Sequence, residues 1–195
     1  MRATGDKVRA RTAAMDAGIP VVPGSTEPVR DPAHAREVAS DIGFPVVLKA
    51  AAGGGGKGIR PVNSPDELNG MFSLAQAEAR TSFGSSELYV EKLIEWPRHV
   101  EVQVLGDGES IVHIWHRECS IQRRYQKLVE EAPVPNLPDR ISDRITQAAV
   151  GFMSAVNYRS AGTVEFLLDS NDDYYFLSLI HISEPTRLGM ISYAV

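Results

Sequence analysis

The segment KAAAGGGGKGIR, residues 49–60, has the residue types that a phosphate-binding loop requires. Its consecutive glycines leave backbone N–H groups accessible to an anion, because no side chain covers them. Lys49 and Lys57, on either side of the glycine run, can add ammonium charges for phosphate oxygens. The segment therefore favours a lid over the phosphates of a nucleotide, with a purely structural hairpin as the alternative.

Two familiar phosphate-binding motifs do not fit this segment. Gly53, Gly55 and Gly58 match G-x-G-x-x-G, but a dinucleotide site needs a helix at the last glycine, and a strand is expected here. A P-loop needs Ser or Thr after its Gly-Lys pair, whereas Lys57 is followed by glycine. A flexible linker is disfavoured because the run joins two predicted strands, PVVLKA and IRPVN, at a hairpin tip.

A second candidate is Glu165, in the predicted strand GTVEFLLD. Strand alternation turns Val164 and Phe166 to one face and leaves Glu165 on the other. A carboxylate inside a sheet is costly unless it is paired or bound to a metal. The next predicted strand, YYFLSL, follows the turn SNDD, and this hairpin would place Ser178 directly opposite Glu165.

The surrounding pattern predicts four helices, including one that Asp31 caps with Pro32 at its first position and one that begins with a capping box of Ser64 and Glu67. Strands are also expected at ELYVEKLI, HVEVQVLGD and IVHIWHRE. This order predicts an α+β fold of two small lobes that meet near residues 92–98, with a ligand cleft between them. The helices are expected at about 4–17, 32–42, 65–83 and 139–157.

Composition excludes several classes of protein. The net charge of −5 argues against nonspecific nucleic-acid binding, and no apolar run reaches membrane-span length. The single cysteine, Cys119, cannot form an internal disulfide. We therefore expect a globular, cytoplasmic protein with neither a nucleic-acid nor a membrane partner.

Five blocks of the sequence, taken in order, resemble the ATP-grasp core of the biotin carboxylase family. They extend from residue 5 to about residue 177 and read GDK, KAAAGGGGKGIR, EKLIEWPRHVEVQVLGD, ECSIQRRYQKLVEEAP and AGTVEFL. The resemblance implies an incomplete ATP-grasp fold, with an N-terminal domain missing before Met1. The implied divisions are a leading helix at 1–20, a lid lobe at 21–93, a second lobe at 94–177 and a tail unlike the family at 178–195.

The resemblance also implies the site residues. Lys7 and Lys49 would bind ATP, and Gly55, Gly56 and Lys57 would contact its phosphates from the lid. The segment Glu91, Lys92, Leu93 and Ile94 would hold adenine through its backbone, with His99 also contacting the nucleotide. Lys127 would contact bicarbonate, with Gln122 and Arg124 beside it in the catalytic block. Tyr125 stands where most members have His, so the contact made there is remade by a phenol or lost.

In the family, Glu165 and a second glutamate on the adjacent strand would hold Mg²⁺ (or Mn²⁺), and this chain has Ser178 at that second place. The family's Asn, Arg and Val-Glu-His segment is also absent beyond Leu177. The tail resembles translated adapter sequence, so we expect residues 178–195 to be foreign to the enzyme. Little or no carboxylase activity is expected of this chain.

For an intact relative, the resemblance implies ATP-dependent carboxylation of carrier-bound biotin with bicarbonate, as a component of an acyl-CoA carboxylase in fatty acid biosynthesis. The implied partners are a biotin carboxyl carrier protein, a carboxyltransferase and a second copy in a homodimer. Two alternatives stay open. One is another ATP-grasp carboxylating ligase, and the other is a noncatalytic nucleotide-binding module.

Overall fold

A computed structural model describes residues 7–52, 58–123 and 126–181, which fall into two compact units. The three-stranded unit comprises Val22–Pro97 and Ile121–Val129. The four-stranded unit comprises Met1–Val21, Arg98–Ser120 and Glu130–Val195. Each unit has its own hydrophobic core, and the chain is α+β, as predicted.

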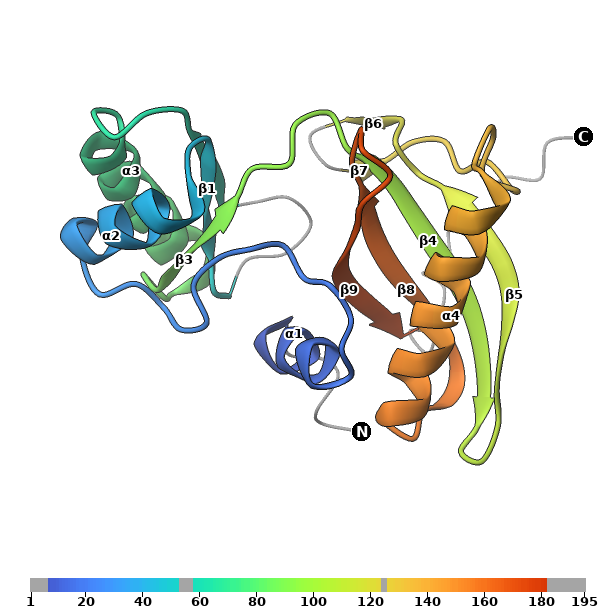
Figure 1. The fold of residues 1–195 in the computed structure, drawn as a ribbon. Coiled ribbons are helices and arrows are strands. Elements are labelled where there is room, and N and C mark those ends of the chain that lie inside the picture. The colour runs from blue at the N-terminus through green and yellow to red at the C-terminus, as the bar shows by residue number, and fades with distance from the viewer. Residues whose placement is uncertain (1–6, 53–57, 124–125, 182–195) are drawn as a thin grey trace, which may run out of the picture. The chain divides into compact units, whose positions relative to one another are not determined.

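The three-stranded unit is an antiparallel sheet in the order β2-β1-β3, formed by β1 (Val46–Ala50), β2 (Ile59–Val62) and β3 (Leu88–Lys92). Helices α2 (Pro32–Ile42) and α3 (Leu68–Phe83) pack on one face of this sheet (Figure 1). The short hairpin β6 (Gln122–Arg123) and β7 (Gln126–Lys127) is also assigned to this unit. β1 and β2 pair on either side of the glycine run, which confirms the predicted hairpin.

Local signals fix the helix ends in this unit. The Asp31 carboxylate accepts a hydrogen bond from the His34 N–H at 2.8 Å, so the predicted cap of α2 is confirmed. Gly84 ends α3 in a left-handed conformation, and its N–H donates to the Arg80 carbonyl. The predicted capping box was wrong. The Glu67 carboxylate accepts from the Asn63 N–H at 3.0 Å instead, and α3 begins one turn later than expected.

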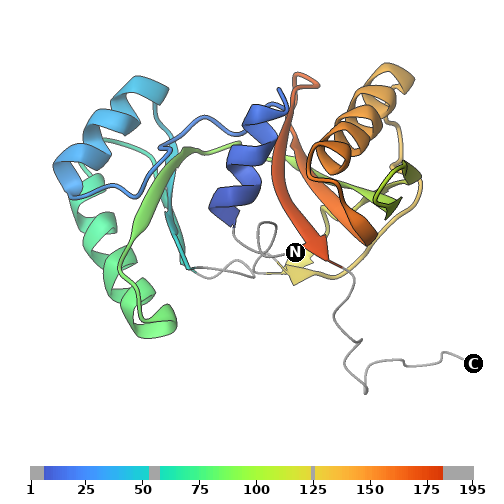
Figure 2. The same cartoon turned by 90° about the horizontal axis from the view of Figure 1, so that it is seen from below.

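The four-stranded unit is an antiparallel sheet in the order β5-β4-β8-β9. Helix α4 crosses one face of the sheet, and α1 lies beside β9 (Figure 2). α1 also contacts α4. The core between helices and sheet is aliphatic and aromatic, and Phe152, Phe166 and Phe176 form its ring cluster. The elements are α1 (Lys7–Asp16), β4 (Arg98–Asp107), β5 (Ile111–Glu118), α4 (Asp139–Ala155), β8 (Arg159–Leu168) and β9 (Tyr174–His181).

The register of β8 positions the candidate carboxylate. Val164 and Phe166 enter the core while Glu165 lies on the opposite face, as alternation predicted. Glu165 pairs with Glu101 on β4 and with Ser178 on β9, so the predicted position of Ser178 is confirmed. The ladder shifts register between Glu165 and Phe166. β8 is thus a central strand that presents one carboxylate between two neighbours.

Candidate functional site

The face of the four-stranded sheet that points away from α4 carries polar residues on neighbouring strands. On β4, His99, Glu101 and Gln103 alternate with three valines that belong to the core. On β8, Thr163 and Glu165 occupy the same polar face. Because these positions face one another across the ladder, strand pairing gathers them into one cluster.

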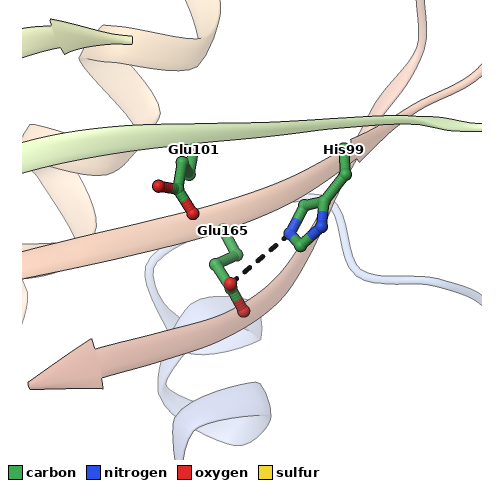
Figure 3. Close-up of side chains that lie close together, drawn as sticks. All are labelled: His99, Glu101 and Glu165. Atoms are coloured by element: carbon green, nitrogen blue, oxygen red, sulfur yellow. Dashed lines mark ion pairs between the residues drawn. The ribbon is translucent and has the colours of Figure 1, made fainter. Parts of the chain in front are cut away.

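The centre of that cluster is formed by His99, Glu101 and Glu165, whose side chains converge in Figure 3. The exposed fractions of these residues are 9%, 1% and 6%, so all three are buried. His99 Nε2 lies 3.5 Å from Glu165 Oε1, and one ligand atom from each residue lies within 4.8 Å of the others. Two buried carboxylates and an imidazole of this kind form a potential cation-binding set.

Arg117, on β5, supplies positive charge to this cluster. Its Nε donates to Glu101 Oε1 at 2.7 Å, and its Nη2 forms an ion pair with the same oxygen. Its Nη1 donates to Gln103 Oε1 at 3.1 Å, and that oxygen also accepts from Thr163. The guanidinium therefore offsets the charge of a carboxylate that is only 1% exposed.

Glu165 is oriented from the other side by Ser178, whose hydroxyl donates to Glu165 Oε2. The backbone of His99 is held as well. Its N–H donates to Ser120 Oγ at 3.0 Å, and its carbonyl accepts from the Cys119 N–H at 2.8 Å. The beginning of β4 and the end of β5 are therefore tied together beside the cluster.

The adjoining ion pair between Arg98 and Glu118 strengthens this connection. Arg98 Nε donates to Glu118 Oε1 at 3.1 Å. The hydrogen bond from Arg98 lowers the pKa of the Glu118 carboxyl, and the same bond raises the pKa of Arg98. Both groups stay charged at neutral pH, so the pair persists next to His99.

The three-stranded unit carries a second group of predicted residues, on the sheet face that bears no helix. Lys49 on β1 forms an ion pair with Glu91 on β3, and the two side chains are 27% and 14% exposed. Val46, Leu48 and Ala50 occupy the other face, in the core. Alternation thus places the Lys49 ammonium on the helix-free face at the strand that leads into the glycine segment.

The segment that follows Glu91 has an ordered backbone. The N–H groups of Lys92 and Leu93 donate to the carbonyls of Pro23 at 2.7 Å and Pro45 at 3.1 Å. Both of these N–H groups are therefore already engaged in hydrogen bonds within the protein. The Lys92 ammonium donates to the Gly43 and Phe44 carbonyls, both at 3.0 Å, just beyond the end of α2.

Of the other predicted residues, Gln122 and Lys127 face each other as a pair in the β6–β7 hairpin, and Ile94 follows β3. Lys7 is the first residue of α1. The structure thus brings together Lys49 with Glu91, His99 with Glu165, and Gln122 with Lys127. Gly55, Gly56, Lys57, Arg124 and Tyr125 lie outside the described residues.

Sequence reasoning missed Glu101 and Arg117. The signal for Glu101 was present, because HVEVQV alternates polar and apolar residues in the same way as the strand that revealed Glu165. Arg117 carried no comparable signal. Its role depends on the register between β4 and β5, which pairs Arg117 with Glu101.

Comparison with protein-family models matches residues 6–182 to the carbamoyl-phosphate synthase L chain, ATP-binding domain. The chain is 48% identical over 189 residues to a biotin carboxylase from Nostoc sp., covering 95% of this chain and 42% of that protein. It is 47% identical over 180 residues to the mitochondrial pyruvate carboxylase of Rattus norvegicus, covering 92% of this chain and 15% of that protein. The chain therefore spans less than half the length of these relatives.

Solved structures of biotin carboxylases are also similar to this chain. The biotin carboxylase beta-gamma-ATP complex from Campylobacter jejuni has a TM-score of 0.87 at 43% identity, covering 92% of this chain and 40% of that one. The biotin carboxylase domain dimer of the Hydrogenobacter thermophilus 2-oxoglutarate carboxylase, in complex with MgADP, ADP and bicarbonate, has a TM-score of 0.86 at 41% identity. It covers 94% of this chain and 42% of that one. The predicted ATP-grasp fold is confirmed by these neighbours.

Proposed function

Because the chain belongs to the carbamoyl-phosphate synthase L chain ATP-binding domain family, with biotin carboxylases among its relatives, we propose that it is the ATP-binding part of a biotin carboxylase. The observation that carries this proposal is the buried cluster of His99, Glu101 and Glu165 in a chain whose solved neighbour holds MgADP and bicarbonate.

In the proposed reaction, a bicarbonate oxygen attacks the γ-phosphorus of ATP and ADP leaves, giving carboxyphosphate. Cleavage of the C–O bond to phosphate then releases CO₂ and inorganic phosphate. The ureido nitrogen of carrier-bound biotin transfers its proton to the released phosphate and forms a bond to the carbon of CO₂. Most of the rate enhancement in such a phosphoryl transfer comes from positioning and from electrostatic stabilisation.

We assign the nucleotide end of this reaction to the residues around Lys49. Its ammonium would contact phosphate oxygens, with Lys7, Gly55, Gly56 and Lys57 adding contacts. The backbone of Glu91, Lys92, Leu93 and Ile94 would hold adenine, and His99 would lie beside the nucleotide. Lys49 forms an ion pair with Glu91 in the described structure. On phosphate binding, the Lys49 ammonium would share its hydrogen bonds between the Glu91 carboxylate and a phosphate oxygen.

The bicarbonate end is assigned to the β6–β7 hairpin. Lys127 would contact the anion, with Gln122, Arg124 and Tyr125 beside it, and the cross-strand pairing of Gln122 with Lys127 supports a shared role. The divalent cation would be held by Glu165, whose carboxylate oxygens match the preference of Mg²⁺ for oxygen ligands. When bound, this ion would neutralise the charge on the phosphates.

For this particular chain we infer nucleotide binding without appreciable biotin carboxylation. Ser178 contributes a neutral hydroxyl to Glu165 at the place where the resemblance implies a second glutamate. This substitution favours the noncatalytic alternative for the chain. We also propose that residues 178–195 are foreign to the enzyme. Sequencing an independent genomic copy past codon 177 tests this hypothesis, and finding the same tail there would refute it.

The partners are proposed on the same basis. They are bicarbonate, a biotin carboxyl carrier protein or domain, a carboxyltransferase and a second copy in a homodimer, the last supported by the domain dimer of the 2-oxoglutarate carboxylase. An acyl-CoA as final acceptor rests on the resemblance alone, since a biotin carboxylase and a pyruvate carboxylase are both 48% identical to the chain.

No helix in the described ranges is long and apolar enough to cross a membrane. A cytoplasmic location is proposed from the single cysteine, although relatives include mitochondrial pyruvate carboxylases.

Calorimetry with Mg-ATP on the purified, folded chain tests the proposed function. We expect saturable binding that ADP competes for, and no binding by a sample with a folded far-UV spectrum would overturn the proposal. A coupled assay for ADP release with bicarbonate and biotin tests the inference of inactivity. Biotin-dependent turnover would contradict it, and turnover that requires ammonia instead of biotin would favour a different carboxylating ligase.

A further inference from the structure

We propose that Gly24 and Ser25 are positioning residues for the nucleotide site, because they hold the end of β3, and that the preference of the site for adenine over guanine depends on them. This role rests on the proposed function, in which residues 91–94 hold adenine through their backbone. Neither Gly24 nor Ser25 is among the residues that the resemblance assigns to the site.

The outer edge of β3 is bonded to the segment that precedes α2. β3 is the last strand of its sheet, so the N–H and C=O groups on its outer edge are available to a further segment. The Ser25 N–H donates to the Val90 carbonyl at 2.8 Å. The Lys92 N–H donates to the Pro23 carbonyl at 2.7 Å. These two bonds lie on either side of Glu91 and fix its backbone between them.

Ser25 forms a second bond to the same strand through its side chain. Its Oγ accepts from the Val90 N–H at 3.1 Å, and the exposed fractions of the two residues are 8% and 0%. In a regular antiparallel pair, a backbone carbonyl would accept this bond. Because Ser25 uses its hydroxyl instead, a change of one side chain leaves the buried Val90 N–H without this acceptor.

Gly24 lies opposite Glu91 in an antiparallel bridge and in close contact with it. A Cβ at position 24 would lie 2.4 Å from the Val90 carbonyl oxygen and 2.9 Å from both Cα and Cγ of Glu91. Since two of these atoms belong to the backbone, an alanine could be accommodated only by a shift of β3. That shift would also move the Glu91 carboxylate, which pairs with Lys49.

The opposite side of the same strand end is held by the sheet and by α2. The Leu93 N–H donates to the Pro45 carbonyl at 3.1 Å, and the Lys92 ammonium donates to two carbonyls just beyond α2. The end of β3 therefore lies between two anchoring segments, 23–25 and 43–45. Loss of one anchor would allow the strand end to shift.

A fixed backbone matters for the choice of base. Adenine carries an amino donor at C6 where guanine carries a carbonyl acceptor, so backbone groups that are held in place can distinguish the two bases. Backbone groups that shift would adapt to either base. The two anchoring residues should therefore affect the discrimination between ATP and GTP as well as the affinity for ATP.

Competition against a fluorescent ATP analogue, with ATP and GTP as competitors on the purified chain, tests the proposal. We expect Ser25→Ala to weaken ATP binding about fivefold, as for one lost hydrogen bond, and GTP binding by less than about twofold. Gly24→Ala should reduce the same preference and also weaken both nucleotides, because it moves the partner of Lys49. A general loss of folded protein would lower both affinities equally and leave their ratio unchanged.

Ser40→Ala and Gly70→Ala are the matched controls. Ser40 Oγ donates to the Arg36 carbonyl within α2, and a Cβ at Gly70 in α3 would meet nothing within 4 Å. Both residues lie in the same unit as Gly24 and Ser25. Neither control should change the affinity for ATP or for GTP.

An unchanged ratio of the two affinities in Ser25→Ala would overturn the proposal, and so would equal affinity of the unmodified chain for ATP and GTP. Should both variants fail to fold, amide hydrogen exchange of Val90 and Lys92 in the unmodified chain decides. Mg-ATP should slow exchange at both amides, and unchanged exchange would overturn the proposal. A chain that binds neither nucleotide would refute the proposed function itself, and the role of Gly24 and Ser25 with it.

Discussion

Glu101 and Glu165 are directly opposed in the β4–β8 ladder, and their exposed fractions are 1% and 6%. Two carboxylates placed across from one another in a sheet repel, so other groups must hold the sheet together at this point. Arg117 provides part of that stabilisation on the β5 side, and Ser178 provides a hydrogen bond on the β9 side. The stability of this region should therefore depend on these two groups.

Replacing Arg117 with Met should destabilise the protein by about 3 kcal/mol, because it leaves the buried Glu101 carboxylate without its guanidinium partner. Urea unfolding monitored by circular dichroism measures the change. Arg140→Met is the matched control, since Arg140 is 69% exposed in its pair with Asp172 and should contribute less than about 1 kcal/mol. A loss from Arg117→Met no larger than that of the control would contradict the role given to Arg117.

Replacing Lys49 with Met should weaken Mg-ATP binding by about 10-fold to 150-fold, which corresponds to loss of a charge-assisted hydrogen bond of about 1.5–3 kcal/mol. The methionine keeps most of the side-chain volume and removes only the ammonium. Calorimetry gives the two dissociation constants directly. Arg60→Met removes an exposed cation that pairs with Glu78 on the same unit and should leave the affinity unchanged. Equal affinities for the Lys49 variant and the unmodified chain would reject phosphate contact by Lys49.

Gly58, where β2 is about to begin, should tolerate a side chain poorly. Its φ is +72°, and a Cβ there would lie 2.8 Å from the Cβ of Ala50 and 3.1 Å from Cε2 of Phe83. Gly58→Ala is expected to destabilise the protein by about 2–3 kcal/mol, from left-handed strain plus the clash.

Gly84→Ala isolates the strain, because Gly84 has a φ of +73° in the same unit and nothing lies within 4 Å of the position that an alanine Cβ would take. About 1 kcal/mol is expected for this control in the same urea experiment. If the two alanine variants unfold at the same urea concentration, close packing around Gly58 is not what requires glycine.

Acid should destabilise the four-stranded unit through His116. Burial lowers the pKa of this imidazole, whose Nδ1 accepts from the Val134 N–H at 3.1 Å and whose Nε2 lies 2.8 Å from Ser142 Oγ. The unfolded chain takes up a proton near pH 6.5, while the folded ring stays neutral to lower pH. The free energy of unfolding should therefore fall as the pH decreases below about 6.5, and level off below the folded pKa.

Urea unfolding at pH 7.5 and pH 5.5 measures this effect, whose upper limit for one imidazole with an unfolded pKa near 6.5 is about 1.4 kcal/mol. His116→Gln can keep one of the two hydrogen bonds but cannot titrate, so its stability should change less between these two pH values. An identical change in the variant and the unmodified chain would show that His116 is not the group responsible.

Much of the fold could be predicted from the sequence because the relevant signals are local. Asp31 before Pro32 set the start of α2, Gly84 set the end of α3, and alternation around Glu165 set the orientation of β8. The predicted pairing of Glu165 with Ser178 is also present, but it depends on the register shift between Glu165 and Phe166, because the register next to the turn would place Leu177 opposite Glu165. The capping box at Ser64 failed because Glu67 found a different backbone N–H, that of Asn63, within the same turn.

The part of the site that escaped prediction depends on contacts between distant segments. Glu101 and Arg117 come together only through the β4–β5 register. Glu101 meets Glu165 only because β8 lies beside β4, although β5, β6, β7 and α4 separate these two strands in the sequence. Residue spacing can indicate a hairpin, but it does not specify which strands become neighbours when other elements lie between them in the sequence. The sequence shows the chemical type of each residue, but the partner of each residue depends on how the strands pair.

The division of the chain has a practical consequence for anyone who wishes to dissect it. Neither unit is a continuous stretch, because Ile121–Val129 is counted with Val22–Pro97 while the segments before and after it belong to the other unit. Cutting the gene at Pro97 would therefore yield two products that each lack a piece of their own unit. Expressing either unit alone therefore requires a gene in which its separated segments are joined in a new order or through a new linker.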